Sequence, residues 1–193
     1  MGADEEYYRG GPVLQGKTLG IIGLGKIGKR SALIGRLGFN MNVIAYDPYV
    51  ESTDADLIGV KLVDLDMLLK ESDVIDIHAN LTDETRSLIG EREIGLMKKS
   101  AIIVNDARGE IINMPALAKA LEEGRIYGAG IDVWPKEPPD PNESWVQSII
   151  RSKLTSLSSH TGTVNEAMVF RHRAALENIK RFCKGQRPQW VVN

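Results

Sequence analysis

The chain has 193 residues, of which 42% are hydrophobic and 26% are charged, a balance typical of a globular protein rather than a disordered or collagen-like one. Lysines and arginines number 24 and aspartates and glutamates 26, and the net charge of -2 argues against a nucleic-acid-binding protein. Cys183 is the only cysteine, which excludes an internal disulfide and a four-cysteine zinc site. We therefore expect a reducing compartment and predict no metal site.

The N-terminal segment 1–11 is acidic and lacks the apolar stretch of a signal peptide. The longest apolar runs, such as 101–104, are too short to cross a membrane. These features lead us to expect a cytoplasmic protein whose partners include neither a membrane nor a nucleic acid.

Short apolar runs alternate with helical patterns along the first part of the chain. A buried strand is expected at Thr18–Gly23, a helix at Lys26–Leu37, a second strand at Asn42–Tyr46 and a short third strand at Val60–Val63. A helix with an acidic N-cap is expected from about Asp64. After it come a strand at Val74–His78, a helix that contains Ile94–Lys98 and a strand at Ala101–Asn105.

The alternation continues to the C-terminus. Asn113 is expected to cap a helix that has Pro115 in its first turn and ends at Gly124. Strands are expected at Ile126–Val133 and Leu154–Leu157, and a long helix at Val164–Cys183. Four of the eight prolines lie between Pro135 and Pro141, which predicts a stiff loop.

This order of elements indicates βαβ units and therefore an α/β fold. We expect a doubly wound, mostly parallel sheet of the Rossmann dinucleotide-binding type. Residues 1–193 are treated as a single dinucleotide-binding domain, with a core at 18–162 and a C-terminal helix and tail at 163–193.

The most informative motif is Gly23-Leu24-Gly25-Lys26-Ile27-Gly28, a G-x-G-x-x-G sequence directly between an expected strand and an expected helix. Gly23 suits a tight turn, Gly25 leaves room for a pyrophosphate, and Gly28 allows the helix to pack closely on the strand. The backbone N–H groups that begin the helix, at Lys26 and Ile27, would face the phosphates.

Asp47 follows the second expected strand, nineteen residues after Gly28. A carboxylate at this place can accept hydrogen bonds from both hydroxyls of the adenosine ribose and would repel a 2′-phosphate, so NAD is favoured over NADP. The alternative is a glycine turn that only packs a helix, with Asp47 as an ordinary turn residue.

The three histidines differ in their surroundings. His78 ends a strand among apolar residues, which favours a structural role with satisfied hydrogen bonds. His172 lies between two arginines in the C-terminal helix, which favours a solvated side chain. His160 lies in a polar loop after the last expected strand, where its ring could face a cofactor bound at the carboxyl ends of the strands.

Several segments together resemble the NAD-dependent D-isomer-specific 2-hydroxyacid dehydrogenases, a family that includes phosphoglycerate dehydrogenase, hydroxypyruvate and glyoxylate reductases, and D-lactate dehydrogenase. The matching segments are Leu14–Gly25, Asp73–His78, Leu81–Arg86, Val104–Gly109, Gly128–Trp134, Glu137–Pro138 and Ser159–His160. Because these motifs follow one another in the same order from about Val13 to the C-terminus, the resemblance is far more specific than the glycine turn alone.

The resemblance implies a catalytic trio of Arg108, Glu137 and His160. Reduction of a 2-keto acid needs a hydride from NADH and a proton for the carbonyl oxygen, and imidazole, with a reference pKa of about 6.5, suits the proton transfer. Glu137 would orient the imidazole ring, and the guanidinium of Arg108 would hold the substrate carboxylate. The resemblance also implies cofactor contacts at Thr82, Ala107 and Asp132, in addition to Gly23, Gly25, Lys26, Ile27 and Asp47. Taken singly, Arg108, Glu137 and His160 could equally be surface and loop residues.

The sequence departs from the family pattern at several positions. Asp106 stands where the family usually has a small or hydroxylated residue, and its charge could compete for the guanidinium of Arg108. Ser159 and Asn80 replace usual prolines, and the spacing from Glu137 to His160 is longer than expected. These departures leave the geometry of the site and the choice of substrate open.

Family members build a substrate domain largely from the chain before the cofactor domain, whereas only residues 1–17 precede the first expected strand here. An independent domain needs at least about 50 residues, so we expect the main body of the substrate domain to be absent and turnover by this chain alone to be weak or nil. The main interpretation is the NAD-binding half of an oxidoreductase that interconverts a small 2-keto acid and a D-2-hydroxy acid. The alternative is an NAD(H)-binding sensor or regulatory module, similar to the family's corepressor relatives, and a homodimer through the cofactor domain is expected in either case.

Overall fold

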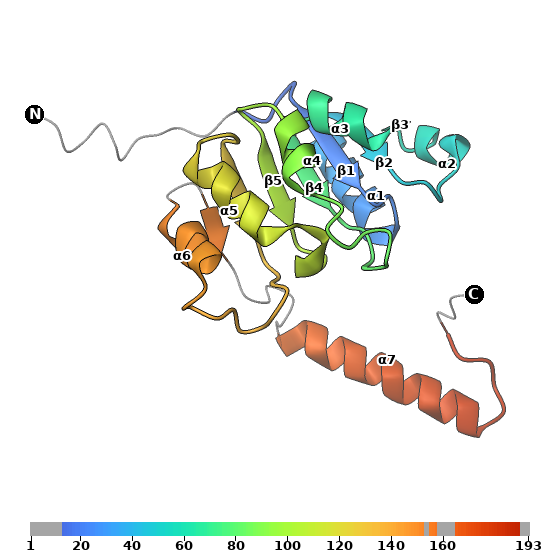
Figure 1. Cartoon of the computed structure of the whole chain (residues 1–193). Coiled ribbons are helices and arrows are strands. Elements are labelled where there is room, and N and C mark those ends of the chain that lie inside the picture. Colours follow the sequence, from blue (N-terminus) through green and yellow to red (C-terminus); the bar gives the residue numbers. More distant parts are fainter. Residues whose placement is uncertain (1–12, 153–154, 158–164, 190–193) are drawn as a thin grey trace, which may run out of the picture. The chain divides into compact units, whose positions relative to one another are not determined.

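The computed structural model describes residues 13–152, 155–157 and 165–189 (Figure 1). The chain divides into two compact units, Met1–Ser158 and Ser159–Asn193, and each is described by itself.

A parallel sheet of seven strands forms the centre of the first unit (Figure 1). The strands are β1 Thr18–Ile22, β2 Asn42–Tyr46, β3 Lys61–Leu62, β4 Val74–Ile77, β5 Ile102–Asn105, β6 Gly128–Ile131 and β7 Thr155–Leu157. They are arranged in the order β3-β2-β1-β4-β5-β6-β7, and all six neighbouring pairs are parallel. The order reverses between β1 and β4, which is where doubly wound sheets bind their ligands. The expected Rossmann-type fold is therefore confirmed.

Helices connect these strands. They are α1 Lys26–Leu33, which continues into the π-helix η1 Ile34–Gly38, then α2 Ser52–Asp56, α3 Leu65–Glu71, α4 Glu91–Leu96, the short 3-10 helix η2 Gly109–Ile111, α5 Met114–Glu122 and α6 Ser144–Arg151. Two hydrophobic clusters make up the core, and β1 contributes to both. Its residues Leu19 and Ile21 pack with Ala32 of α1, whereas Ile22 packs with Leu68 and Leu69 of α3. This alternation is the reason why β1 is apolar on both faces.

The predicted caps are confirmed. The carboxylate of Asp64 accepts a hydrogen bond from the backbone N–H of Met67 at 2.7 Å, and α3 begins directly after it. The side-chain carbonyl of Asn113 accepts one from the N–H of Ala116 at 3.0 Å, and Pro115 lies in the first turn of α5. Side-chain acceptors therefore set where both helices begin.

The structure corrects several boundaries. The helix expected at Lys26–Leu37 changes to π-type hydrogen bonding after Leu33. The helix expected to contain Ile94–Lys98 begins at Glu91, where the side chain of Glu93 accepts the N–H of Gly90 at 3.1 Å, and ends at Leu96, so Lys98 lies outside it. The strands expected at Val60–Val63 and Ile126–Val133 are limited to two and four residues by the length of their pairing with β2 and β5.

The sequence did not predict α2 and α6. The helix α6 starts soon after the proline-rich loop, and its buried residues Val146 and Ile149 share one face. Both α6 and β7 lie between Glu137 and position 160, which accounts for the long spacing noted between these two catalytic candidates.

In the second unit, α7 spans Asn165–Cys183. The amide side chain of Asn178 bonds the backbone of Gln189 in both directions, at 2.8 and 3.0 Å, and so fastens the segment after the helix. His172 is exposed, in agreement with its expected solvation. Large apolar side chains of α7, among them Phe170, Ile179 and Phe182, are also exposed. In the described part of the chain, no helix is both long and apolar enough to cross a membrane.

Candidate functional site

The glycine turn lies at the carboxyl end of β1 and leads directly into α1. A Cβ atom on Gly23 would lie 2.6 Å from the backbone N of Ala79, and one on Gly28 would lie 2.1 Å from the carbonyl oxygen of Gly23, so both positions require glycine for close packing. A Cβ atom on Gly25, by contrast, would have no atom within 4 Å. The turn is therefore packed on its inner side and open beside Gly25.

The N-terminus of α1 is left open as well. Gly25 is its N-cap, no side chain accepts a hydrogen bond there, and its first turn contains no acidic residue. The first hydrogen bond of the helix joins Lys29 N–H to Gly25 O at 2.9 Å, so the N–H groups of Lys26, Ile27 and Gly28 have no partner within the helix. Backbone donors of this kind can bind phosphate, and the open space beside Gly25 lies next to them.

Asp47 lies beside the turn, just after β2. One oxygen of its carboxylate accepts the backbone N–H of Leu24 at 2.8 Å, and the other accepts that of Tyr49 at 2.9 Å. These bonds orient the carboxylate while each oxygen keeps a second lone pair for a further donor. The geometry is thus compatible with the predicted contacts to two ribose hydroxyls.

Thr82 and Tyr49 belong to loops on either side of β1. The backbone N–H of Thr82 donates to Oγ1 of Thr85 at 2.8 Å, which shapes the loop after β4. From the loop after β2, the hydroxyl of Tyr49 donates to the carboxylate of Glu84, and this hydrogen bond and the nearby charge raise the pKa of Tyr49. A bridge therefore joins the two loops that flank β1 in the sheet.

Arg108 lies in a short loop after β5, and the fully buried Asn105 holds this loop in shape. The Asn105 amide donates to the carbonyl oxygen of Arg108 at 2.9 Å and accepts the N–H of Ala107 at 3.1 Å. The guanidinium of Arg108 is exposed, and its Nη1 donates to the carbonyl of Ala107 at 2.6 Å. Asp132, at the end of β6, donates its N–H to the carbonyl of Asn105 at 3.0 Å. The predicted residues Ala107, Arg108 and Asp132 are thus adjacent.

Glu137 lies in the proline-rich loop, next to the Arg108 loop. Its carboxylate accepts the N–H of Trp134 at 3.0 Å, and the Glu137–Pro138 peptide bond is cis. A Cβ atom on Gly109 would lie 2.2 Å from the carbonyl carbon of Trp134, so the two loops are in close contact. His160 lies outside the described residues, and its pairing with Glu137 stays a prediction.

His78 and Asp106 form an ion pair that sequence reasoning missed. Nδ1 of His78 lies 3.2 Å from Asp106, and Nε2 lies 2.9 Å from Asp76. Burial of the ring would lower its pKa, but hydrogen bonds to the two carboxylates, together with their charges, raise the pKa of His78 to about 9. Asp106 thus pairs with His78. Its position two residues before Arg108 in the sequence had suggested Arg108 as the partner instead. Strands β4 and β5 are adjacent only in the folded sheet, so neighbouring residues gave no signal of this pair.

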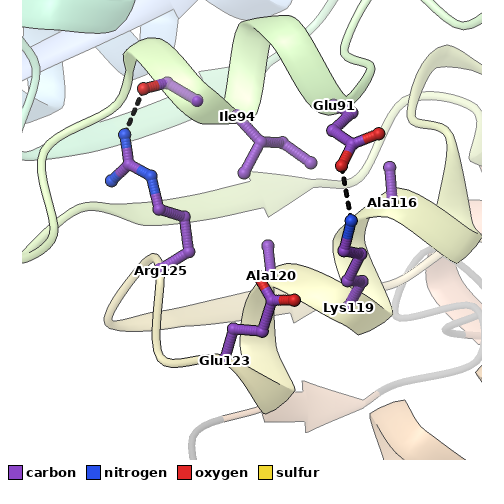
Figure 2. Close-up of a pocket in the computed structure, with 8 residues that line it drawn as sticks. Glu91, Ile94, Ala116, Lys119, Ala120, Glu123 and Arg125 are labelled. Atoms are coloured by element: carbon purple, nitrogen blue, oxygen red, sulfur yellow. Dashed lines mark hydrogen bonds and ion pairs between the residues drawn. The ribbon is translucent and has the colours of Figure 1, made fainter.

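Two surface cavities lie on the first unit, one apart from this site and one next to it. Figure 2 shows one of about 190 Å³ between α4 and α5, where Lys119 bonds Glu91 at 2.6 Å and Arg125 donates to the carbonyl of Gly95. The Lys119–Glu91 ion pair and the Arg125 hydrogen bond join α4 to α5 and to the segment after it, which fits packing between helices. The other, of about 410 Å³, is lined by residues of the Arg108 and Glu137 surroundings, including Glu110, Pro135 and Lys136.

A parallel sheet with an open glycine turn at its switch point and an oriented carboxylate after the second strand defines a dinucleotide-binding protein. The family model for the D-isomer specific 2-hydroxyacid dehydrogenase, NAD binding domain, matches residues 4–162. The chain belongs to this family, whose cofactor is NAD.

Similar proteins agree with this assignment. The chain is 42% identical over 187 residues to D-3-phosphoglycerate dehydrogenase of Methanocaldococcus jannaschii, covering 93% of this chain and 34% of that protein. It is 42% identical over 184 residues to glyoxylate reductase of Aeropyrum pernix, covering 95% and 53%. Among solved structures, apo D-mandelate dehydrogenase of Rhodotorula graminis matches with a TM-score of 0.84 at 30% identity, covering 94% of this chain and 52% of that one. D-lactate dehydrogenase of Lactobacillus jensenii with NAD+ matches with a TM-score of 0.84 at 27% identity, covering 100% and 59%. The chain therefore spans about a third to a half of the length of these curated relatives.

Proposed function

We propose that this chain is the NAD-binding half of an oxidoreductase that interconverts a small 2-keto acid and a D-2-hydroxy acid. The observation that carries the proposal is the open N-terminus of α1, which has the oriented carboxylate of Asp47 on one side and the Arg108 loop on the other side of the same sheet edge. Similarity to phosphoglycerate dehydrogenase and glyoxylate reductase supports the reaction class.

In this proposal, the adenosine and pyrophosphate part of NAD lies along the glycine turn. The backbone at Gly23, Gly25, Lys26 and Ile27 binds the pyrophosphate, and Asp47 accepts the hydroxyls of the adenosine ribose. Thr82 contacts the second ribose, and Ala107 and Asp132 contact the nicotinamide. When bound, the cofactor supplies or accepts the hydride.

The chain's own side chains then serve the substrate. Arg108 presents a planar set of N–H donors that binds the substrate carboxylate and polarises the keto group. His160 delivers a proton to the carbonyl oxygen during reduction and accepts it during oxidation. Glu137 accepts a hydrogen bond from the other ring nitrogen and stabilises the imidazolium form. A substrate domain completes the site by excluding water, so we expect weak or no turnover by this chain alone.

Two further features belong to the proposal. Relatives of this family pair through the cofactor domain, which supports a homodimer, and sedimentation would measure it. The single cysteine supports a reducing compartment such as the cytoplasm.

Calorimetric titration with NADH tests the cofactor site. Replacement of Asp47 by alanine removes two acceptors for ribose hydroxyls, and we expect about tenfold weaker binding. Asp54→Ala is the matched control, because Asp54 is an exposed carboxylate whose ion pair with Lys29 lies on the surface. Absence of NADH binding to the unaltered chain at millimolar concentrations would refute the assignment.

NADH oxidation with glyoxylate, hydroxypyruvate and pyruvate tests the reaction. In the chain joined to the substrate domain of a relative, turnover should be lost in Arg108→Ala and His160→Ala, and robust turnover that survives His160→Ala would contradict the proposed proton donor. NADH binding without turnover of any keto acid, even when the chain is joined to the substrate domain of a relative, would favour the sensor alternative.

A further inference from the structure

The strongest unexplained feature of the described residues is the cluster of Asp76, His78 and Asp106. Asp76 lies on β4, His78 directly follows that strand, and Asp106 follows the adjacent strand β5. The His78 side chain is only 5% exposed, and each of its ring nitrogens faces one carboxylate, at 2.9 Å and 3.2 Å. Since a carboxylate accepts but does not donate, both nitrogens must carry protons for both contacts to be hydrogen bonds. The ring is therefore an imidazolium held between two anions.

The cluster connects the glycine turn to the Arg108 loop. The backbone N–H of His78 donates to the carbonyl of Ile22 at 2.8 Å, and a Cβ atom on Gly23 would lie 2.8 Å from the carbonyl carbon of His78. On the other side, Asp106 begins the loop whose next residues are Ala107 and Arg108. The ion pair thus fastens this loop to the backbone that packs against the turn.

Asp106 is paired with the His78 imidazolium and not with the Arg108 guanidinium. Its carboxylate bonds His78, while the Arg108 guanidinium donates to the carbonyl of Ala107 at 2.6 Å. Without the imidazolium, the Asp106 carboxylate would be available to the guanidinium two residues away. The ion pair with His78 therefore also keeps Arg108 available for a substrate carboxylate.

We propose that Asp106 is a positioning residue that, through its ion pair with His78, holds the Ala107–Arg108 loop in place for the nicotinamide end of NAD and for the substrate. This inference rests on the proposed function. It assigns a positioning role to a residue that departs from the family pattern, and it gives Asp106 no direct contact with cofactor or substrate.

A metal ion is the other chemistry that these three residues could serve. In this arrangement, however, the two carboxylates face different ring nitrogens, which diverge from one another. Asp76 also accepts a hydrogen bond from the hydroxyl of Ser31 on α1 at 2.5 Å. These contacts fit an ion-paired imidazolium, and stoichiometric metal binding at these residues would overturn the proposal.

Binding of NADH and of ADP-ribose to the chain tests the proposal. ADP-ribose has the adenosine and pyrophosphate groups but lacks nicotinamide, so it reports on the glycine turn without the Arg108 loop. We expect Asp106→Asn to lower the affinity for NADH about tenfold, which is the effect of losing one well-formed ion pair. The affinity for ADP-ribose should stay within about twofold of that of the unaltered chain. Asp106→Glu should restore most of the lost NADH affinity. Asp56→Asn, at an exposed aspartate on α2, should leave the affinity for both ligands unchanged.

The pH dependence separates positioning from a general structural role. His78 is faced by Asp76 from β4 and by Asp106 from the loop after β5, and Ser31 of α1 reaches only Asp76. In the unaltered chain, the preference for NADH over ADP-ribose should decrease as the pH rises through about 9, where the ring loses its proton. In Asp106→Asn, the preference should be weak already at neutral pH.

The outcomes are distinct. An equal loss of affinity for both ligands in Asp106→Asn would show a general structural role and overturn the proposal. Unchanged affinity for both ligands would also overturn it. Stoichiometric binding of Zn²⁺ that depends on His78 and Asp106 would replace the ion pair by a metal site. Failure of the unaltered chain to bind either nucleotide would refute the proposed function itself, whereas nucleotide binding with no effect of Asp106→Asn would refute only this inference.

Discussion

The helices α1 and α5 have similar lengths, eight and nine residues, but their first turns differ. At α5, the side chain of Asn113 accepts the N–H of Ala116, and Pro115 removes another donor from the first turn. At α1, Gly25 offers no side chain, and no acidic residue follows. A capped N-terminus stabilises its helix within the protein alone, whereas an uncapped one keeps its N–H groups for a ligand. Under the proposed function, the comparison separates a helix start that serves stability, at Asn113, from one that serves binding, at Gly25.

Gly25→Val should have the largest effect on binding. The φ and ψ angles of Gly25, -74° and -161°, suit a β-branched residue, and its Cβ atom would meet nothing within 4 Å, so the fold should be retained. The new side chain would occupy the space beside the helix N-terminus, and we expect NADH affinity to fall at least about 100-fold, or about 3 kcal/mol. Calorimetry measures the affinity, and thermal unfolding should show a nearly unchanged Tm.

Gly28→Ala is the matched control for this prediction. Its Cβ atom would lie 2.1 Å from the carbonyl oxygen of Gly23, so the main consequence should be loss of stability. Near-normal NADH binding by Gly25→Val would show that the open side of the turn does not receive the phosphates.

Local sequence predicted much of the region formed by β1, the glycine turn and α1. The apolar residues of β1, the glycines of the turn and the carboxylate of Asp47 follow one another in an order that a short segment specifies by itself, and the structure forms β1, the turn and α1 from them. The caps at Asp64 and Asn113 were predictable for the same reason, because each depends on residues within three positions.

Features that depend on distant contacts were not predictable. The charge of Asp106 was readable from the sequence, but its partner lies on the next strand of the sheet, so proximity along the chain pointed to Arg108 instead of His78. The boundaries of β3 and β6 depend on how far their neighbours extend, and α6 follows a proline-rich loop that predicted no helix. The roles of Arg108, Glu137 and His160 came from resemblance, and they stay predictions.

The pH dependence of stability adds to the comparison of α1 with α5, because the charged groups around His78 lie beside the open turn before α1. The pKa of His78 in the folded protein, about 9, exceeds the ordinary value of 6.5. The folded state therefore holds the proton more tightly, and the stabilisation is complete below pH 6.5 and is lost as the pH rises to about 9. Allowing for solvent around the partly exposed Asp106, we expect a loss of about 1–2 kcal/mol over this range.

Urea unfolding between pH 6 and pH 9.5 measures this loss. His78→Gln should remove most of the slope, which separates it from the titration of other groups. An unchanged slope in His78→Gln would assign the pH dependence to those other groups and contradict the raised pKa.

Asn113→Ala should have the smallest effect and the opposite selectivity to Gly25→Val. It removes the acceptor for the N–H of Ala116 at the start of α5, and we expect the free energy of unfolding to fall by about 1 kcal/mol, with NADH affinity unchanged. Asn113→Asp keeps an acceptor at the same place and should be close to the unaltered chain in stability. Urea unfolding and NADH titration of both variants provide the measurement. A fall in NADH affinity in Asn113→Ala comparable to its loss of stability would mean that the two helix ends are energetically coupled. The cap at α5 is local, so it could affect phosphates bound at α1 only through the stability of the whole sheet.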